Sequence, residues 1–334
     1  MDPKTFQAEL FRMIKMAVPG QHDLVATVAG VLQISNDSCY RRLRGDKLLD
    51  LAEMITLCQH FKLSLDSLLG LQGNRILFTS NHASPAEYDF LNYMKGLVQN
   101  MKFLNSLPER KMYYECKDIP IFYFFHSREL AAFKYFFWHK FLFRQDRSSN
   151  AKFDLHNYPD ELYALGCQAA SLYYGMPSAE FWNIETIQST LRQLCLYYDT
   201  GNFERKEDAL LILQKIHELI QDLENICRTG VKNFSFAKDF SQGGGPMETY
   251  VNEVLLGSNM ILVKLGAGRV VYLNHSVFNY ATTTDLDFGL YIENYFKTLA
   301  DSSTQISCVS ETERNIFFRK LFRSIDSCRE HIMQ

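Results

Sequence analysis

Apolar residues recur at helical spacing through residues 1–70, and residues that begin or end helices interrupt them at short intervals. Ser35 stands where an N-cap accepts a backbone N–H, and Gly45 stands where a residue with positive φ ends a helix. The pattern stops at Gly70, so we expect a first domain over residues 1–73 and a linker over 74–83. Five short helices are predicted in the first domain, near residues 3–16, 23–32, 35–44, 51–61 and 65–69.

The next region, residues 84–240, is predicted to be a helical middle domain. Its first helix carries a two-heptad apolar stripe with alternating steps of four and three residues. We call this stripe the candidate dimer seam, because it can pair two copies of the chain. Packing against the same chain is the alternative, since two heptads are short for a coiled coil. The candidate dimer seam consists of Phe90, Met94, Leu97, Met101 and Leu104.

Residues 113–143 of the middle domain carry thirteen aromatic side chains. We expect these rings either to form a dense core or to line a cavity for an apolar or planar effector. A small molecule or a peptide would fit such a cavity, and four residues with polar tips or large rings are its candidate lining. These candidate effector-pocket residues are Tyr123, His126, Tyr135 and Trp138.

The pattern of apolar residues changes after a run of glycines at 243–245. Short runs rich in Val, Ile, Leu and Tyr at 249–256, 260–265 and 269–273 alternate with glycine turns, which predicts an antiparallel meander. Two helical segments follow. Residues 247–334 are therefore expected to form a small α+β domain with antiparallel strands, and the whole chain is expected to be mainly α.

The composition excludes several classes of protein. The chain has 334 residues, of which 47% are hydrophobic, and a net charge of −3, so it is neither disordered nor broadly attractive to nucleic acid. Its eight cysteines lie at least 19 residues apart, which excludes a paired-cysteine zinc motif and favours a reducing compartment. No catalytic spacing or membrane span is recognisable. We expect a cytoplasmic protein that is not an enzyme and has no cofactor, no metal and no membrane contact.

The strongest functional signal lies in residues 24–45. Two predicted helices meet there at a short turn, with a small residue, Ala29, on the first helix and inward-facing Cys39 and Leu43 on the second. This arrangement resembles the helix-turn-helix of lambda-repressor-like domains, the Cro and phage-repressor type. Residues 1–70 cover the usual length of that five-helix bundle. The resemblance implies a DNA-binding domain whose second motif helix enters the major groove.

The chain departs from the family pattern at two positions. Gln33 occupies the tight turn where the family usually has glycine, and Arg42 stands where a more apolar residue is common. A residue other than glycine tolerates positive φ at moderate cost, so we expect the motif to keep its geometry.

The outward positions of the second motif helix supply the candidate DNA contacts. Side chains that can hydrogen-bond to base edges are the candidate base contacts, namely Asn36, Asp37, Tyr40 and Arg41. Neighbouring polar and basic side chains are the candidate phosphate contacts, namely Ser35, Arg42, Arg44 and Lys47.

The expected function is sequence-specific transcriptional regulation through binding of double-stranded DNA. Residues 1–73 carry eight basic and eight acidic side chains, and a neutral domain binds DNA weakly as a single copy, so we expect a homodimer. The remaining chain would dimerise, sense an effector, or both. The alternative is a scaffold protein whose N-terminal bundle binds another protein instead of DNA.

Overall fold

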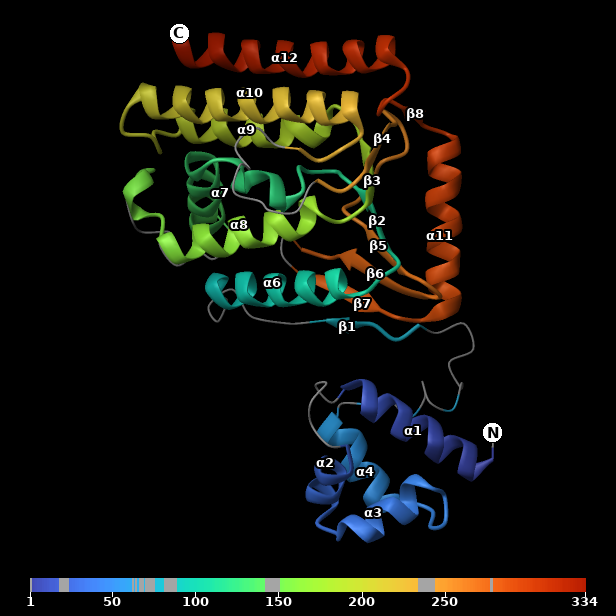
Figure 1. Cartoon of the computed structure of the whole chain (residues 1–334). Coiled ribbons are helices and arrows are strands. Elements are labelled where there is room, and N and C mark those ends of the chain that lie inside the picture. The colour runs from blue at the N-terminus through green and yellow to red at the C-terminus, as the bar shows by residue number, and fades with distance from the viewer. Residues whose placement is uncertain are drawn as a thin grey trace. The chain divides into compact units, whose positions relative to one another are not determined.

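The computed structural model of the chain describes residues 2–17, 24–61, 63, 65, 69, 76–80, 89–141, 151–233, 244–276 and 279–334 (Figure 1). The chain forms two compact units, Met1–Leu77 and Phe78–Gln334, which we call unit 1 and unit 2. Helices make up most of the described structure, and the described strands belong to one mixed sheet in unit 2.

The described residues of unit 1 form four short helices, which confirm the corresponding predicted ones to within one residue at each end. These are α1 (Pro3–Ala17), α2 (Leu24–Leu32), α3 (Asn36–Leu43) and α4 (Leu51–Phe61). The predicted fifth helix, at 65–69, lies mostly outside the described residues. Ile14 of α1, Val28 of α2 and Leu57 of α4 are fully buried in one cluster, so the apolar stripes of these helices share a core.

Unit 2 contains the sheet and the longer helices. Its α-helices are α6 (Phe90–Ser106), α7 (Arg128–Phe141), α8 (Asp160–Tyr174), α9 (Glu185–Asp199), α10 (Lys206–Thr229), α11 (Leu286–Asp301) and α12 (Glu311–Met333), with 3₁₀-helices η1 (Ile121–His126) and η2 (Leu155–Asn157). Its strands are β1 (Thr79–Ser80), β2 (Arg110–Glu115), β3 (Ser178–Trp182), β4 (Met247–Val251), β5 (Ile261–Leu265), β6 (Gly268–Asn274), β7 (Tyr280–Thr283) and β8 (Thr304–Gln305).

The strands of unit 2 follow the order β1-β7-β6-β5-β2-β3-β4-β8 across the sheet. β2, β3 and β4 pair in parallel at the centre, and the other described pairings are antiparallel. Helices α7 and α8 connect β2 to β3, while α9 and α10 connect β3 to β4, because parallel neighbours need long crossover connections.

Helices cover both faces of the sheet (Figure 1). On one face α11 packs through Ile292 and Phe296 onto Phe181 of β3. On the other face lie α6 to α10, and Trp182, the next residue of β3, belongs to the large core there. Successive residues of a strand point to opposite faces, so β3 is buried on both sides.

The shared sheet corrects the expected domain boundaries. Strands β2 and β3 come from residues 84–240, and they pair with β5 and β4 from residues 247–334, so these two regions form one unit rather than two domains. The expected linker, 74–83, contains the edge strand β1, which pairs with β7. Of the three runs predicted to form an antiparallel meander, those at 260–265 and 269–273 pair with each other as β5 and β6, whereas β4 pairs in parallel with β3. The third antiparallel strand is β7, which the sequence pattern does not predict.

Candidate nucleic-acid interface and ligand pocket

The helices α2 and α3 meet at a turn centred on Gln33. Gln33 has a φ of +54°, in the left-handed region that favours glycine. Its N–H donates to the Gly30 carbonyl at 3.3 Å. The next N–H, of Ile34, donates to the Ala29 carbonyl at 3.0 Å, which satisfies the last carbonyls of α2. The predicted positive φ without glycine is therefore confirmed.

Both ends of α3 are fixed by the residues that the sequence predicts. At the N-terminus the Ser35 hydroxyl accepts a hydrogen bond from the Ser38 N–H at 3.3 Å. At the C-terminus Gly45 has a φ of +74°. The Asp46 N–H donates to the Arg41 carbonyl at 2.8 Å, which is the bond of a Schellman motif. A helix of only eight residues is thus held at each end.

The two faces of α3 have opposite characters. Cys39 is fully buried against the bundle core, with Ala29 of α2 in the same cluster, and Leu43 packs against that cluster half-buried. The four candidate base contacts are exposed, and the Tyr40 side chain keeps 49% of its surface accessible even though it is aromatic. The predicted orientation of the helix is therefore confirmed for both sets of residues.

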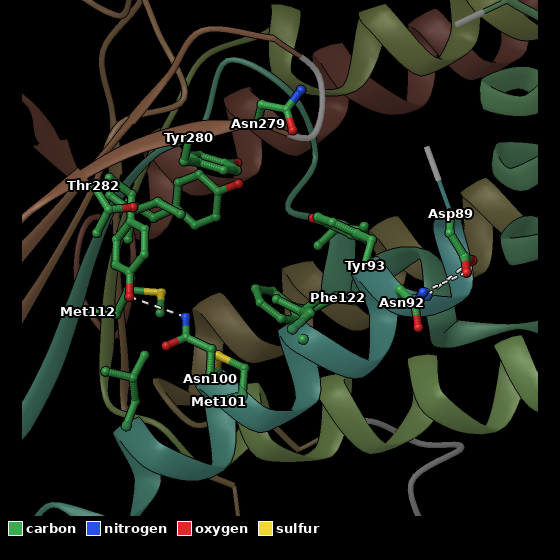
Figure 2. Close-up of a pocket in the computed structure, with 17 residues that line it drawn as sticks. Asp89, Asn92, Tyr93, Asn100, Met101, Met112, Phe122, Asn279, Tyr280 and Thr282 are labelled. Atoms are coloured by element: carbon green, nitrogen blue, oxygen red, sulfur yellow. Dashed lines mark hydrogen bonds between the residues drawn. The ribbon is translucent and has the colours of Figure 1, made fainter. Parts of the chain in front are cut away.

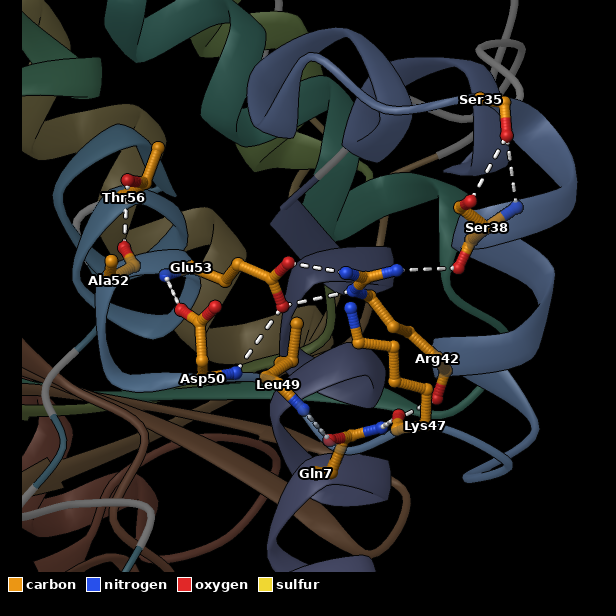
Figure 3. Close-up of polar contacts among 10 residues, drawn as sticks. All are labelled: Gln7, Ser35, Ser38, Arg42, Lys47, Leu49, Asp50, Ala52, Glu53 and Thr56. Carbon is orange, nitrogen blue, oxygen red and sulfur yellow. Dashed lines mark hydrogen bonds and ion pairs between the residues drawn. The ribbon is translucent and has the colours of Figure 1, made fainter.

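Arg42 is the exception, and its assignment as a phosphate contact is corrected. Only 3% of its side chain is exposed. Figure 3 shows its guanidinium directed at Glu53 of α4, with Nε 2.9 Å from Oε2 and Nη2 on Oε1. Nη1 donates to the Ser38 carbonyl at 2.9 Å. The hydrogen bonds from Arg42 lower the pKa of the Glu53 carboxyl, so the ion pair is charged at neutral pH.

A second brace, from Gln7 of α1, was not foreseen from the sequence. Its buried side-chain amide donates to the carbonyls of Arg42 at 2.7 Å and Lys47 at 2.9 Å, and its Oε1 accepts from the Leu49 N–H at 2.7 Å (Figure 3). The segment that follows α3 is therefore tied to α1, while α3 itself is tied to α4 through Arg42. These two braces hold the exposed face of α3 at a fixed orientation within unit 1.

Residues 35–47 carry four basic and two acidic side chains in the sequence, but the net charge of their exposed face is smaller. Arg42 is neutralised by Glu53, which leaves Arg41, Arg44 and Lys47 as exposed basic side chains against Asp37 and Asp46. Residues 35–47 therefore present one excess positive charge. Arg44 is itself paired with Asp46, with 3.0 Å between Nε and Oδ2, although both side chains stay largely exposed.

The candidate effector-pocket residues are placed in the core of unit 2 instead of around a cavity. Tyr123 is fully buried and donates to Glu180 Oε1 at 2.6 Å, and His126 Nε2 lies 2.9 Å from Asp222 Oδ2. Trp138 is buried against Phe124 and Phe90, and Tyr135 packs half-buried among Phe90, His139 and Tyr158. The dense-core alternative thus describes these four residues, whose rings pack against other side chains of the core. Two other rings of the segment 113–143, Tyr114 and Phe122, line the pocket described below.

Glu180 and Lys232 form the polar centre of this core, and the sequence pattern does not single them out. Glu180 accepts hydrogen bonds from Tyr123, Tyr173 and, at 2.9 Å, the Trp182 indole. Lys232 donates to the carbonyls of Tyr173 at 3.0 Å and Met176 at 2.7 Å. Burial lowers the pKa of Lys232 to about 7. These side chains are enclosed by protein, so they stabilise the core rather than meet a ligand.

The candidate dimer seam is also corrected, because its own chain covers it. Phe90, Met94, Met101 and Leu104 are buried, and Leu97 is half-buried, in the core that α6 shares with α8 and the sheet. The amphipathic-helix alternative therefore describes α6. An apolar stripe specifies that something covers it, but not which chain does so.

A pocket of about 590 Å³ lies between α6 and strands β2, β5, β6 and β7 (Figure 2). Its polar lining residues are Asp89, Asn92, Asn100, Asn279 and Thr282, and its aromatic lining residues are Tyr93, Tyr114, Phe122, Tyr272 and Tyr280. Asn100 donates through Nδ2 to the Tyr272 hydroxyl at 3.2 Å across the pocket. The lining residues come from both the helical region (84–240) and the strand-rich region (247–334), so no single stretch of sequence predicts the pocket.

Comparisons with known proteins yield no match to this chain among family models, curated proteins or solved structures. Within the described ranges, no group of three His, Cys, Asp or Glu side chains is placed to hold a metal ion. None of the helices in those ranges is both long and apolar enough to cross a membrane. Function is therefore inferred from the geometry of the two sites.

Proposed function

We propose that the protein is a DNA-binding transcriptional regulator of the lambda-repressor-like type, with α3 as the helix that reads the major groove. One observation carries the proposal: α3 is short, fixed at both ends and braced from α1 and α4, while its polar side chains Asn36, Asp37, Tyr40 and Arg41 remain exposed. A reading helix needs this combination, because base-edge contacts require both rigid placement and accessible polar groups.

The exposed residues suit separate roles in such a complex. Arg41 can pair bidentately with guanine, and Asn36 with adenine, while Asp37 can accept from cytosine. Arg44 and Lys47, together with the Ser35 hydroxyl at the helix N-terminus, are the groups that we propose to contact phosphates. Arg42 has no direct role in this proposal. It positions α3 through Glu53.

Binding would require two copies of the chain. One excess positive charge on the reading face gives a single copy little electrostatic affinity, and two half-sites double the number of contacts. Unit 2 supplies the surface for pairing in this proposal, although the α6 stripe is already covered by its own chain.

Titration of binding against salt tests the proposal. Full-length protein is mixed with random duplexes, bound sequences are selected, and affinity is measured by fluorescence anisotropy over a range of salt concentrations. With Arg44 and Lys47 contributing from two copies, log K should fall with log salt at a slope of about −3.6. Lys47→Ala should weaken all duplexes alike and flatten the slope, whereas Arg41→Ala should lose about 1–3 kcal/mol of discrimination at one base pair.

A second candidate function, binding of another protein by unit 1, is favoured by one observation. Leu48, Leu51 and Ile55 are exposed beside the braced loop, and Leu51 and Ile55 are one helical turn apart on α4. Exposed apolar side chains grouped in this way suit a protein partner. Under this alternative the selected duplexes show no salt-dependent binding, and Leu51→Asp rather than Arg41→Ala abolishes complex formation.

A further inference from the structure

The walls of the unit 2 pocket carry almost no charge. Asp89 is the one charged side chain among the lining residues that the structure describes, and none of them is a lysine, arginine or histidine. The Asp89 carboxylate caps α6, accepting from the N–H groups of Leu91 at 2.9 Å and Asn92 at 3.2 Å and from the Asn92 amide at 2.7 Å. A phosphate or carboxylate entering the pocket would lose water without gaining a positive partner, which is costly.

The aromatic walls are held in place by their own neighbours. Phe122 stacks on the buried Tyr173 with ring centroids 4.2 Å apart, and Tyr272 meets Tyr280 edge-on at 6.3 Å. Rings that are already fixed offer flat surfaces without a further loss of side-chain freedom when a ligand stacks on them. The pocket is therefore preorganised for a molecule with a flat face.

The polar groups of the pocket are carboxamides and phenols, which both donate and accept hydrogen bonds. Burial raises the pKa of Tyr114, Tyr272 and Tyr280 above the ordinary value of tyrosine, so these phenols remain protonated at neutral pH. Asn100 on α6 and Tyr272 on β6 already bond to each other across the pocket. Groups of this kind recognise the edge of an uncharged ring system.

We propose that this pocket binds an uncharged, planar molecule with hydrogen-bonding groups on its edge, and that it excludes anions. Its volume lies within the range of about 300–1,000 Å³ that is usual for small-molecule sites. That such a ligand regulates DNA binding rests on the proposed function, whereas the binding itself does not.

The pocket has an accessible side and a closed side. Asn92 and Gly96, on successive turns of α6, are exposed, while Met101, Met112 and Phe122 at the other side are buried. Apart from its chain neighbours and the backbone of α6 itself, no atom of the described residues lies within 4 Å of the position that a Cβ on Gly96 would occupy. A larger side chain at position 96 can therefore occupy the pocket without a clash, and it favours the helix over glycine.

Two dyes that share one skeleton test the proposal in the full chain. N-phenyl-1-naphthylamine is uncharged and has two ring systems joined by an N–H, and 8-anilino-1-naphthalenesulfonate adds a sulfonate to that skeleton. Fluorescence titration should give at least tenfold tighter binding of the uncharged dye. Gly96→Leu should weaken its binding at least tenfold, while Gln99→Leu, at an exposed position of α6 outside the pocket, should leave it unchanged.

Circular dichroism and thermal unfolding show whether Gly96→Leu is folded. If that variant misfolds, Asn100→Leu, which removes the carboxamide from the pocket, takes its place with the same expected loss. Equal or tighter binding of the sulfonated dye would overturn the proposal, as would undiminished binding of the uncharged dye by a folded Gly96→Leu variant. No DNA is present in this titration, so a failure to bind DNA and a failure to bind the dye are distinguishable.

Discussion

Replacement of Glu53 by glutamine tests whether α3, the proposed reading helix, is held by the ion pair between Arg42 and Glu53. The substitution keeps the size of the side chain and removes its charge, so a guanidinium that is only 3% exposed loses its counter-ion. Loss of one partner of a buried pair costs about 3–5 kcal/mol. The Glu53 side chain is itself 16% exposed, so water offsets part of the loss, and we expect a cost of about 2–3 kcal/mol.

Hydrogen exchange of the full chain, read by mass spectrometry, measures this cost locally. Unit 1 has no tryptophan, since Trp138 and Trp182 both lie in unit 2, so fluorescence would not report on it. A loss of about 2–3 kcal/mol should speed exchange of α3 and α4 amides by about 30- to 150-fold. A domain of this size is stable by about 4–11 kcal/mol, so the variant should stay folded.

The matched control is Glu9→Gln, which removes an ion pair on the surface of the same unit. Glu9 and Arg12 lie one turn apart on α1 with side chains 34% and 61% exposed. Such a pair contributes less than about 1 kcal/mol, so exchange should change by fivefold at most. Equal exchange rates for α3 in the two variants would refute the structural role of Arg42.

The pH dependence of the Glu53→Gln effect has a definite sign. Hydrogen bonds from Arg42 lower the pKa of Glu53 in the folded state below its ordinary value of 4.5. A lowered folded pKa means that the stabilisation is present above the unfolded pKa and is lost as the pH falls through the folded pKa. The difference in exchange between wild type and Glu53→Gln should therefore be constant near neutral pH and shrink below about pH 4.5.

Three further predictions concern other parts of the chain. Gln33→Gly should relieve the backbone strain of the left-handed conformation at φ +54° and stabilise unit 1 by about 0.5–1 kcal/mol. Hydrogen exchange of the α2 amides should then slow by about two- to fivefold, whereas faster exchange would mean that the glutamine is not strained. Met101→Glu places a carboxylate in the core of unit 2, so it should lower the free energy of unfolding by about 3 kcal/mol or more, as measured by urea unfolding followed by tryptophan fluorescence. A loss of mass in light scattering without that loss of stability would restore α6 as a dimer seam. The Sγ atoms of Cys195 on α9 and Cys328 on α12 lie 2.8 Å apart, and the hydrogen bond from Cys328 lowers the pKa of Cys195. The oxidant diamide should therefore consume these two thiols first. If all eight thiols of the chain can still be titrated after treatment, that geometry is contradicted.

Unit 1 could be predicted well from the sequence because its signals are local. Ser35 and Gly45 cap the helix they adjoin, and Cys39 and Leu43 lie on one face by helical spacing alone. The inward orientation of Arg42 can be predicted from helical spacing in the same way, since Arg42 follows Cys39 by three residues and lies on the same face. Its partner Glu53 stands on the next helix, so only the tertiary structure brings the two together.

Unit 2 was harder to predict because its signals are long-range. Every residue of β3 is buried, so the strand lacks the alternation that marks a half-exposed strand, and it pairs with β2 and β4, each more than sixty residues away. The pocket joins α6 to β6 and β7 across a much larger separation, since Asn100 and Tyr272 are 172 residues apart in the sequence. Asn100 and Tyr272 have no sequence feature that links them, and their contact follows from the order of strands in the sheet.

Methylation interference on a selected duplex tests most directly whether α3 reads the major groove. Methylation of guanine N7 blocks contacts in the major groove, and methylation of adenine N3 blocks contacts in the minor groove. Wild-type protein should lose binding when guanine N7 is methylated within each half-site. Arg41→Ala should be insensitive to methylation at one of those guanines. Lys47→Ala should keep the wild-type pattern of interference. Interference confined to adenine N3, or the absence of any selected duplex at low salt, would contradict the proposed function.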